Sequence, residues 1–399
     1  MITDPGSLAA AADDFGHIVH HRPRAVARPT DAAEVVAILR EAGGRGVRAR
    51  GKGHTAAGQA QVADGIVVEM DRLATIQDIA DDRIVVDAGA TWRSVVTATA
   101  AHGRTPPVLT DYLDVTVGGT LSAGGVGGGS HRHGLQTDNV LALDVVTQDG
   151  QTTCSAETSP DLFRAALAGY GRAGIITRAT LRLVPAPATV RRYVLSYPSA
   201  AARAHDQRLL VRDGRFEHLQ GQMIAGPDGW RHLLEAGAFD SQDDATLLAG
   251  LAFDPEGSEI TDLTHLEFAD RLAPGVAFLR ETGDWYCPHP WWNAFLPDST
   301  VDDFMNRLGT RLTSAGLGAS GLVLTYPINT APVRTALFEL PHEPVVFLVS
   351  LLRTAPRDDP ATLADMLADN DYWYEQALAA GGTVYPIGTV PTSAARRAP

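Results

Sequence analysis

The chain has 399 residues, of which 45% are hydrophobic and 20% are charged, a composition typical of a globular protein long enough for two domains. Acidic residues outnumber basic ones by 47 to 33, and the net charge of −14 disfavours nucleic acid as a partner, since such binding needs clustered Lys and Arg. No apolar run approaches the roughly 18–20 residues that span a membrane, and no secretory signal opens the chain, so we expect a cytoplasmic protein without a membrane partner.

The first half predicts a mixed α+β domain rather than a regular alternation of strand and helix. Thr30 or Asp31 caps a predicted helix over residues 32–44, whose apolar side chains recur at helical spacing. A second helix is predicted over 92–103. Short runs bounded by Gly, Asp or Pro predict strands at 47–50, 65–70, 83–90, 143–148 and 179–185.

The character of the sequence changes near Pro187. The remainder holds every tryptophan except Trp92 and predicts strands over 321–328 and 345–352 and helices over 244–254 and 362–382. We therefore place a domain boundary after residue 186.

Two glycine-rich stretches stand out, RARGKGHTAAGQ at 48–59 and a second at 110–134, which carries eight glycines between Gly118 and Gly134. Glycine lets backbone amides come close to a ligand such as a pyrophosphate. Neither stretch is a Walker A motif or a nicotinamide-binding GxGxxG unit. Two such turns in one domain predict a long ligand held at its diphosphate. Composition alone equally allows flexible surface loops.

Six segments carry a resemblance to a known family: RARGKGHTAAGQA, LTDYLDVTVGGTLSAGGVGGGSHRHG, NVLALDVVTQDG, DLFRAALAGYGRAGIITRATL, HPWWNAFLP and AAGGTVYPIGTVP. In this order they resemble the vanillyl-alcohol oxidase / p-cresol methylhydroxylase (PCMH) superfamily, most closely the cytokinin dehydrogenases and their bacterial relatives. The resemblance implies an α+β, two-domain flavoprotein. A PCMH-type FAD-binding domain would cover 1–186, an α+β substrate-binding cap with an antiparallel sheet would cover 187–382, and 383–399 would return to the first domain.

The resemblance also implies FAD as the cofactor, joined covalently through His54 of the G-x-G-H-[ST] turn. A non-covalent contact is the alternative, and the lack of a cysteine in the 118–134 loop leaves a single link. The implied cofactor contacts are the amides of Ala49, Arg50, Gly51, Lys52 and Gly53, together with Thr55, Gln59, Asp111, Thr116, Ser122, Val126, Ile176 and Tyr385. For Val126 and Ile176, core packing is the alternative.

Asp111 lies five residues before Thr116, where the family keeps its catalytic aspartate. Hydride transfer from a carbon next to an amine requires the N–H proton to leave, and a carboxylate can accept that proton. A loop cap is the alternative role of Asp111, and Asp114 is expected to face solvent. Trp291 of the H-P-W motif is implied to line the substrate cavity, because aromatic walls suit flat substrates. Trp292 is equally well read as a core residue.

No metal is expected. His131 and His133 lack a third ligand in the sequence, so we interpret them as structural or close to the cavity entrance. Cys154 and Cys287 form no CxxC motif, and a cytoplasmic setting disfavours a disulfide between them.

Three departures from the family pattern concern substrate and cofactor. Arg208 lies near the place of an acidic residue that holds the purine in plant members, the second loop is unusually rich in glycine, and the chain stops at PTSAARRAP without the family's terminal FAD-contacting segment. The predicted activity is an FAD-dependent oxidase or dehydrogenase that converts a small secondary amine to an imine, with oxygen or a quinone as electron acceptor. The alternatives are an alcohol or sugar oxidase, whose base is usually a tyrosine or histidine, and a flavin-binding protein with degenerate catalysis.

Overall fold

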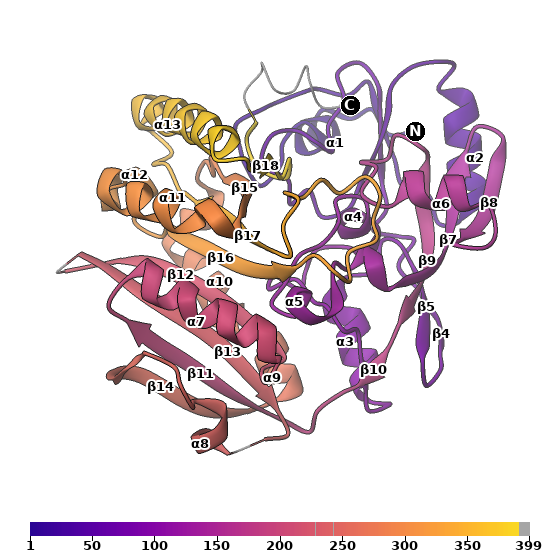
Figure 1. Cartoon of the computed structure of the whole chain (residues 1–399). Helices are drawn as coiled ribbons and strands as arrows, with labels where there is room; N and C mark the ends of the chain where they lie inside the picture. The colour runs from indigo at the N-terminus through magenta and orange to yellow at the C-terminus, as the bar shows by residue number, and fades with distance from the viewer. Residues whose placement is uncertain (228, 242, 391–399) are drawn as a thin grey trace. The chain divides into compact units, whose positions relative to one another are not determined.

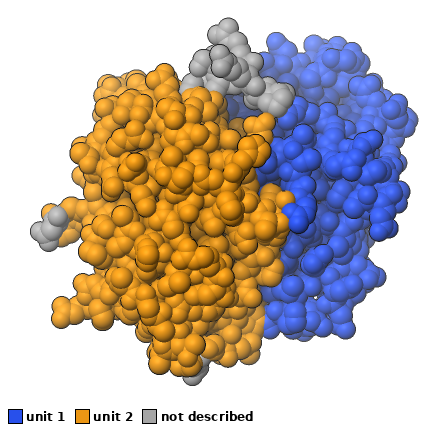
Figure 2. Space-filling view, in the orientation of Figure 1, with its two compact units in different colours: residues 1–126, 135–186, 334–338 blue, residues 127–134, 187–333, 339–399 orange. Residues whose placement is uncertain are grey.

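The computed structural model describes residues 1–227, 229–241 and 243–390. The chain divides into two units, coloured separately in Figure 2. Unit 1 comprises residues 1–126, 135–186 and 334–338, and unit 2 comprises 127–134, 187–333 and 339–399. The short segment 334–338 is held within unit 1 by Asp138, whose Oδ1 accepts hydrogen bonds from the amides of Arg334 and Thr335 at 2.7 and 2.9 Å.

Unit 1 begins with α1 (Pro5–Ala11) and contains a three-stranded parallel sheet in the order β1 (Ala25–Ala27), β3 (Ile66–Glu69), β2 (Val47–Arg50). Helix α2 (Ala32–Glu41) packs beside it through Val35 and Ile38, and Asp31 caps the helix by accepting from the Glu34 amide at 2.9 Å. The helix ends just before Gly43 and Gly44, which take φ of +58° and +85°.

A five-stranded antiparallel sheet completes the framework of unit 1. Its order is β4 (Ile76–Ile79), β5 (Arg83–Asp87), β9 (Ile175–Arg182), β7 (Val140–Thr147), β8 (Gly150–Ser155). Around it lie α3 (Trp92–Ala100), α4 (Val117–Leu121), η1 (Thr137–Asn139), α6 (Pro160–Ala166) and the pair β6 (Arg104–Thr105) and β10 (Val184–Pro185). The predicted strands of the first half are therefore present.

Unit 2 is built on one eight-stranded antiparallel sheet (Figure 1). Its order is β14 (Asp254–Thr264), β11 (Thr189–Tyr197), β13 (Gly229–Phe239), β12 (His218–Gly226), β16 (Leu322–Asn329), β17 (Val345–Leu352), β15 (Trp292–Pro297), β18 (Thr383–Val384). The fold class predicted for the chain, a two-domain α+β protein with an antiparallel sheet in the second domain, is confirmed.

Helices cover one face of this sheet more fully than the other. Helices α7 (Ala200–Asp213), α11 (Asp298–Arg311) and α13 (Pro360–Ala379) share apolar clusters with alternate residues of β11, β12, β13, β15, β16 and β17. The opposite face carries α5 (Ser130–His133) and α9 (His265–Ala269), since Gly128 and Phe268 approach His218 and Gly237 from that side. The remaining helices are α8 (Asp244–Leu247), α10 (Ala273–Thr282), η2 (Asp284–Tyr286) and α12 (Ser314–Leu317).

One predicted helix is wrong. Residues 244–254 were expected to be helical, but α8 ends at Leu247, Gly250 takes φ of +74°, and the chain enters β14 at Asp254. A positive φ at glycine stops a helix whatever the apolar spacing around it. By contrast, the predicted strands near 321–328 and 345–352 and the long helix near 362–382 are present as β16, β17 and α13.

The chain passes from unit 1 to unit 2 after Ala186, and the proposed domain bounds stay a prediction. The predicted return of residues 383–399 to the first domain stays a prediction. Residues 383–390 group with unit 2. Residues 391–399, the PTSAARRAP segment in which the family's terminal FAD-contacting part was expected to be missing, lie outside the described residues. Cys154 and Cys287 are free thiols. Within the described ranges, no helix is both long and apolar enough to cross a membrane.

Candidate functional site

The first glycine turn directly follows β2. Gly53 takes φ of +65°, and a Cβ on Gly51 would lie 2.2 Å from the Thr116 hydroxyl, so glycine is required at both positions. In the described part of the chain, the amides of Gly51, Lys52 and Gly53 donate no hydrogen bond to the protein. A row of available amides in a tight turn is a binding site for an anion such as a diphosphate.

His54 follows this row of amides and is held between two aromatic rings. Its ring centroid lies 4.2 Å from that of Phe15 and 4.7 Å from that of Tyr112, with interplanar angles of 40° and 39°. The side chain is half-buried. The two rings therefore restrict the orientation of the imidazole, which stays partly accessible to a ligand.

The two glycine stretches meet in unit 1 where Gly51 faces Thr116. Thr116 caps α4 by accepting from the Gly119 amide, which leaves its hydroxyl proton as a donor toward a ligand. Two other predicted contacts have committed their hydroxyl protons: Thr55 donates to Asp14 at 2.7 Å and Ser122 donates to the Gly118 carbonyl at 2.7 Å. Both can still accept a hydrogen bond.

The second half of the glycine-rich loop serves packing in unit 2. A Cβ on Gly128 would lie 2.1 Å from the His218 ring, and the Gly128 carbonyl accepts from the Leu219 amide at 3.0 Å. His131 is buried here, 2.8 Å from the Gly128 carbonyl and 3.0 Å from the Phe216 carbonyl. Burial lowers the pKa of His131 to about 4, so a neutral ring donates to one carbonyl at neutral pH.

Asp111 lies beside this site through its neighbour in sequence. It immediately precedes Tyr112, whose ring contacts His54, so unit 1 brings the predicted base and the predicted tether into one neighbourhood. Asp114 forms a two-point ion pair with Arg93, at 2.6 and 3.2 Å, and its side chain stays 34% exposed, so it still partly faces solvent.

Trp291 and Tyr385 are brought together within unit 2. The chain returns antiparallel to residues 291–293: the Tyr385 amide donates to the Asn293 carbonyl at 3.1 Å, and the Thr389 amide donates to the Trp291 carbonyl at 2.6 Å. The Tyr385 ring lies 5.3 Å from that of Phe295. Trp292 is 1% exposed and stacks on Phe304, in agreement with the core interpretation.

The other predicted residues have local roles. The Gln59 side chain accepts from the Ala57 amide at 2.9 Å, while Val126 and Ile176 are buried in unit 1. Arg208 ion-pairs with Asp298 and with Asp302, the latter at 3.0 Å, which ties α7 to α11. These ion pairs explain structurally why an arginine stands at position 208, near the place where plant members of the family carry an acidic residue.

Sequence reasoning missed Asp14, Phe15 and Tyr112. Asp14 is 3% exposed and accepts hydrogen bonds from the first glycine turn, and the two aromatic rings flank His54. Asp14 and Phe15 lie about forty positions upstream of the turn and belong to no glycine motif. The one available signal was an acid directly before an aromatic residue and a glycine.

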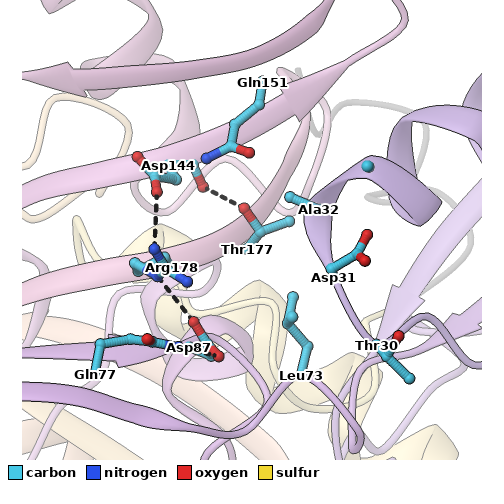
Figure 3. Close-up of a pocket in the computed structure, with 11 residues that line it drawn as sticks. Thr30, Asp31, Ala32, Leu73, Gln77, Asp87, Asp144, Gln151, Thr177 and Arg178 are labelled. Atoms are coloured by element: carbon cyan, nitrogen blue, oxygen red, sulfur yellow. Dashed lines mark hydrogen bonds and ion pairs between the residues drawn. The ribbon is translucent and has the colours of Figure 1, made fainter.

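A cavity of about 400 Å³ lies on a different part of unit 1 (Figure 3). Arg178 lies in it between Asp87, at 2.9 Å, and Asp144, at 4.0 Å. None of the predicted site residues lines this cavity, so it is separate from the glycine turn. Within the described residues, no cluster of three or more His, Cys, Asp or Glu side chains is arranged to hold a metal ion.

The residues of unit 1 fit a dinucleotide cofactor: available amides for a diphosphate, Thr116 as a further donor, and glycines that admit close approach. A family model described as an FAD binding domain matches residues 23–155. A second, described as "Cytokinin dehydrogenase 1, FAD and cytokinin binding", matches residues 235–381.

Similar full-length proteins agree with these matches. The chain is 39% identical to an "uncharacterized oxidoreductase ORF5 in fasciation locus" of Rhodococcoides fascians, over 98% of this chain and 90% of that protein. It is 35% identical to cytokinin dehydrogenase 10 of Oryza sativa subsp. japonica, over 88% and 74% of the two chains. It is 33% identical to cytokinin dehydrogenase 2 of Arabidopsis thaliana, over 90% and 80%.

Proposed function

The chain belongs to the cytokinin dehydrogenase family of FAD-dependent oxidoreductases, and on this premise we propose that it oxidises a secondary amine of the cytokinin class to an imine. The predicted family and the predicted cofactor, FAD, are both confirmed. The class of bond oxidised, the covalent link and the electron acceptor are parts of the proposal.

One observation supports the proposal: within unit 1, His54 follows the glycine turn and its ring contacts that of Tyr112, the residue after Asp111. The amides of Gly51, Lys52 and Gly53 are available for the diphosphate, and the flanking rings fix the imidazole of His54. Asp111 supplies a carboxylate next to the ring that contacts His54. In this proposal the turn would bind the diphosphate, His54 would act as the nucleophile and Asp111 would act as the base.

When bound, FAD would supply the acceptor for the hydride that leaves the carbon next to the substrate nitrogen. Asp111 would accept the N–H proton or hold it by a hydrogen bond, so that the nitrogen lone pair can form the C=N bond. Water then adds to the imine and releases an aldehyde and an amine. The two electrons would leave to dioxygen or a quinone. Trp291 would provide an apolar wall for a flat substrate.

His54 would carry the covalent link. That link would join an imidazole nitrogen of His54 to the 8α carbon of the flavin, with loss of one hydrogen from each atom, and dioxygen would take up the two electrons and two protons as hydrogen peroxide. A covalent bond removes cofactor dissociation as a route of inactivation, which suits a turn whose other contacts are mostly backbone amides.

The test is to precipitate the purified protein in acid and then to measure anaerobic bleaching of the native flavin. We expect the yellow colour to stay with the precipitate, and we expect secondary amines with a flat nitrogen substituent to bleach the flavin while primary alcohols and sugars do not. Colour released to the supernatant would remove the covalent link. Bleaching by alcohols alone would replace the amine with an alcohol substrate.

Lys52 offers a direct test of the diphosphate position, because it is the only lysine in the chain and its side chain is exposed. A diphosphate bound at the neighbouring amides would pair with the ammonium group and shield it from the reagent, so we expect FAD to slow acetylation of Lys52 by on the order of tenfold. Peptide mass spectrometry of flavin-free and flavin-loaded protein measures this, with an added lysine-containing peptide as the internal control. Equal rates at Lys52 would place the diphosphate elsewhere.

A further inference from the structure

Residues 10–16, which we call the N-terminal clasp, fold against the glycine turn and precede the segment 23–155 that matches the FAD-binding family model. We propose that Asp14 in this clasp is a positioning residue for flavin attachment: it holds residues 53–58 so that the His54 imidazole reaches the flavin. This inference rests on the proposed function and adds a residue to it that the family model does not cover.

The contacts of Asp14 converge on the turn. Its Oδ2 accepts from the Thr55 hydroxyl and from the Gly58 amide, both at 2.7 Å, and its Oδ1 accepts from the Gly16 amide at 3.1 Å. These donors flank His54 on its C-terminal side, at one and four residues from it. One buried carboxylate therefore ties both ends of the segment 55–58 to the clasp.

Backbone hydrogen bonds attach the clasp to the turn on both sides of His54. The Phe15 amide donates to the Gly53 carbonyl at 2.9 Å, and the Gly16 amide donates to the Thr55 carbonyl at 3.0 Å. A Cβ on Gly16 would lie 2.1 Å from the Ala56 carbonyl oxygen, so the two segments run in direct contact. With the Phe15 ring 4.2 Å from the His54 ring, the clasp touches residues 53–56 in succession.

The Arg50 side chain also packs against the turn. Its Nη2 donates a hydrogen bond to the Ala10 carbonyl at 3.4 Å, and a Cβ on Gly53 would lie 2.3 Å from the same nitrogen. Burial raises the pKa of Asp14. The hydrogen bonds from Thr55, Gly58 and Gly16 and the nearby charge of Arg50 act in the opposite direction, but burial has the larger effect. Burying an acid in this way is costly unless its hydrogen bonds are satisfied. Here all of them serve the turn or the clasp itself.

The chemistry explains why position matters at this point. Forming the bond between nitrogen and the 8α carbon requires the imidazole to be held in reacting geometry. A displacement of about 1 Å can slow such a step on the order of a hundredfold. Available backbone amides can hold a diphosphate over a range of turn conformations, whereas the covalent step depends on a single orientation of one ring.

The experiment measures the rate of covalent attachment after FAD is added to full-length protein prepared without flavin. Intact-mass spectrometry follows the increase by one FAD. We expect Asp14→Ala to slow attachment by ten- to a hundredfold, and Thr55→Val to slow it less, because the Gly58 amide bond to Asp14 remains. Thr55→Ser, which keeps the hydroxyl, should restore the wild-type rate. Should Asp14→Ala fail to fold, Asp14→Asn and Thr55→Val provide the same comparison.

Asp87→Asn is the matched control. Asp87 is also 3% exposed in unit 1 and accepts hydrogen bonds from Gln77 and Arg178, both at 2.9 Å, away from the turn. We expect Asp87→Asn to lower the unfolding temperature as Asp14→Ala does, yet to leave the attachment rate unchanged. A role limited to stability would instead make both variants alike in attachment.

The outcomes separate the two proposals. Wild-type protein that attaches FAD, with an Asp14→Ala variant that attaches it equally fast, would overturn the positioning role alone. Wild-type protein that binds FAD without a covalent bond would overturn attachment through His54 and, with it, the role of Asp14. Wild-type protein that binds no FAD would overturn the proposed function itself.

Discussion

Replacing Asp111 by Asn is expected to slow flavin reduction by an amine substrate roughly 10²- to 10⁴-fold, the range typical of a lost general base. Asparagine keeps the size of the side chain but cannot accept the N–H proton, so hydride transfer loses its drive from the nitrogen lone pair. FAD content should stay at the wild-type level, because the diphosphate amides and His54 are unchanged. Anaerobic stopped-flow absorbance measures the rate, and the colour of the acid precipitate measures covalent flavin.

Asp114→Asn is the matched control for this experiment. Asp114 lies three residues further along the same segment, and its carboxylate is engaged by Arg93 at 2.6 and 3.2 Å. We expect this variant to reduce its flavin within a fewfold of the wild-type rate. Similar losses in both variants would mean that the segment, rather than the Asp111 carboxylate, supports the reaction.

Replacing Glu235 by Gln is expected to destabilise unit 2 by about 3–5 kcal/mol, as when a buried ion pair loses one partner. Glu235 is 2% exposed and ion-pairs with Arg192 at 2.5 Å and with Arg271 at 2.8 Å. Burial alone would raise its pKa, but Arg271, His218 and Arg192 outweigh burial and lower the pKa to about 2. This lowering from the ordinary value is itself worth about 3 kcal/mol.

Calorimetry tests this prediction. For a unit of this size, the unfolding temperature should fall by on the order of 10 °C. Because its folded pKa lies below the ordinary value of 4.5, Glu235 stabilises the wild type fully above that pH and progressively less as the pH falls toward 2. Asp262→Asn is the control: Asp262 pairs with Arg191 at 3.0 Å but is 48% exposed, so a change within about 1 kcal/mol is expected. Equal losses would show that burial adds nothing to the Glu235 network.

Local signals in the sequence predicted many elements correctly. Asp31 caps α2 as expected, and β2, β16 and β17 lie where their apolar runs placed them, because caps and apolar periodicity act over a few residues. The strand β14 was missed because most of its residues are exposed and polar, so it shows no apolar alternation. Backbone pairing with β11, rather than burial of its side chains, holds β14 in the sheet.

The candidate site divides in the same way. The glycine turn and His54 were recognisable because glycine spacing is a local feature. Asp14 was not, since its partners Thr55 and Gly58 lie more than forty residues away and only the fold brings them together. Likewise, the glycines near 128 were read as part of a cofactor loop, whereas Gly128 makes room for His218 of β12. A glycine-rich composition indicates that the backbone comes close to another group. Whether that group is a ligand or a side chain of the protein depends on the tertiary structure.

The two free thiols differ in their exposure, and this difference allows a distance measurement by energy transfer. Burial, with the nearby charge of Asp144, raises the pKa of Cys154 to about 11, so its thiolate is scarce at neutral pH, whereas Cys287 of unit 2 is partly exposed. A maleimide dye should therefore label Cys287 alone. Energy transfer between that dye and the flavin of unit 1 would then report the distance between the units during turnover, without any engineered cysteine.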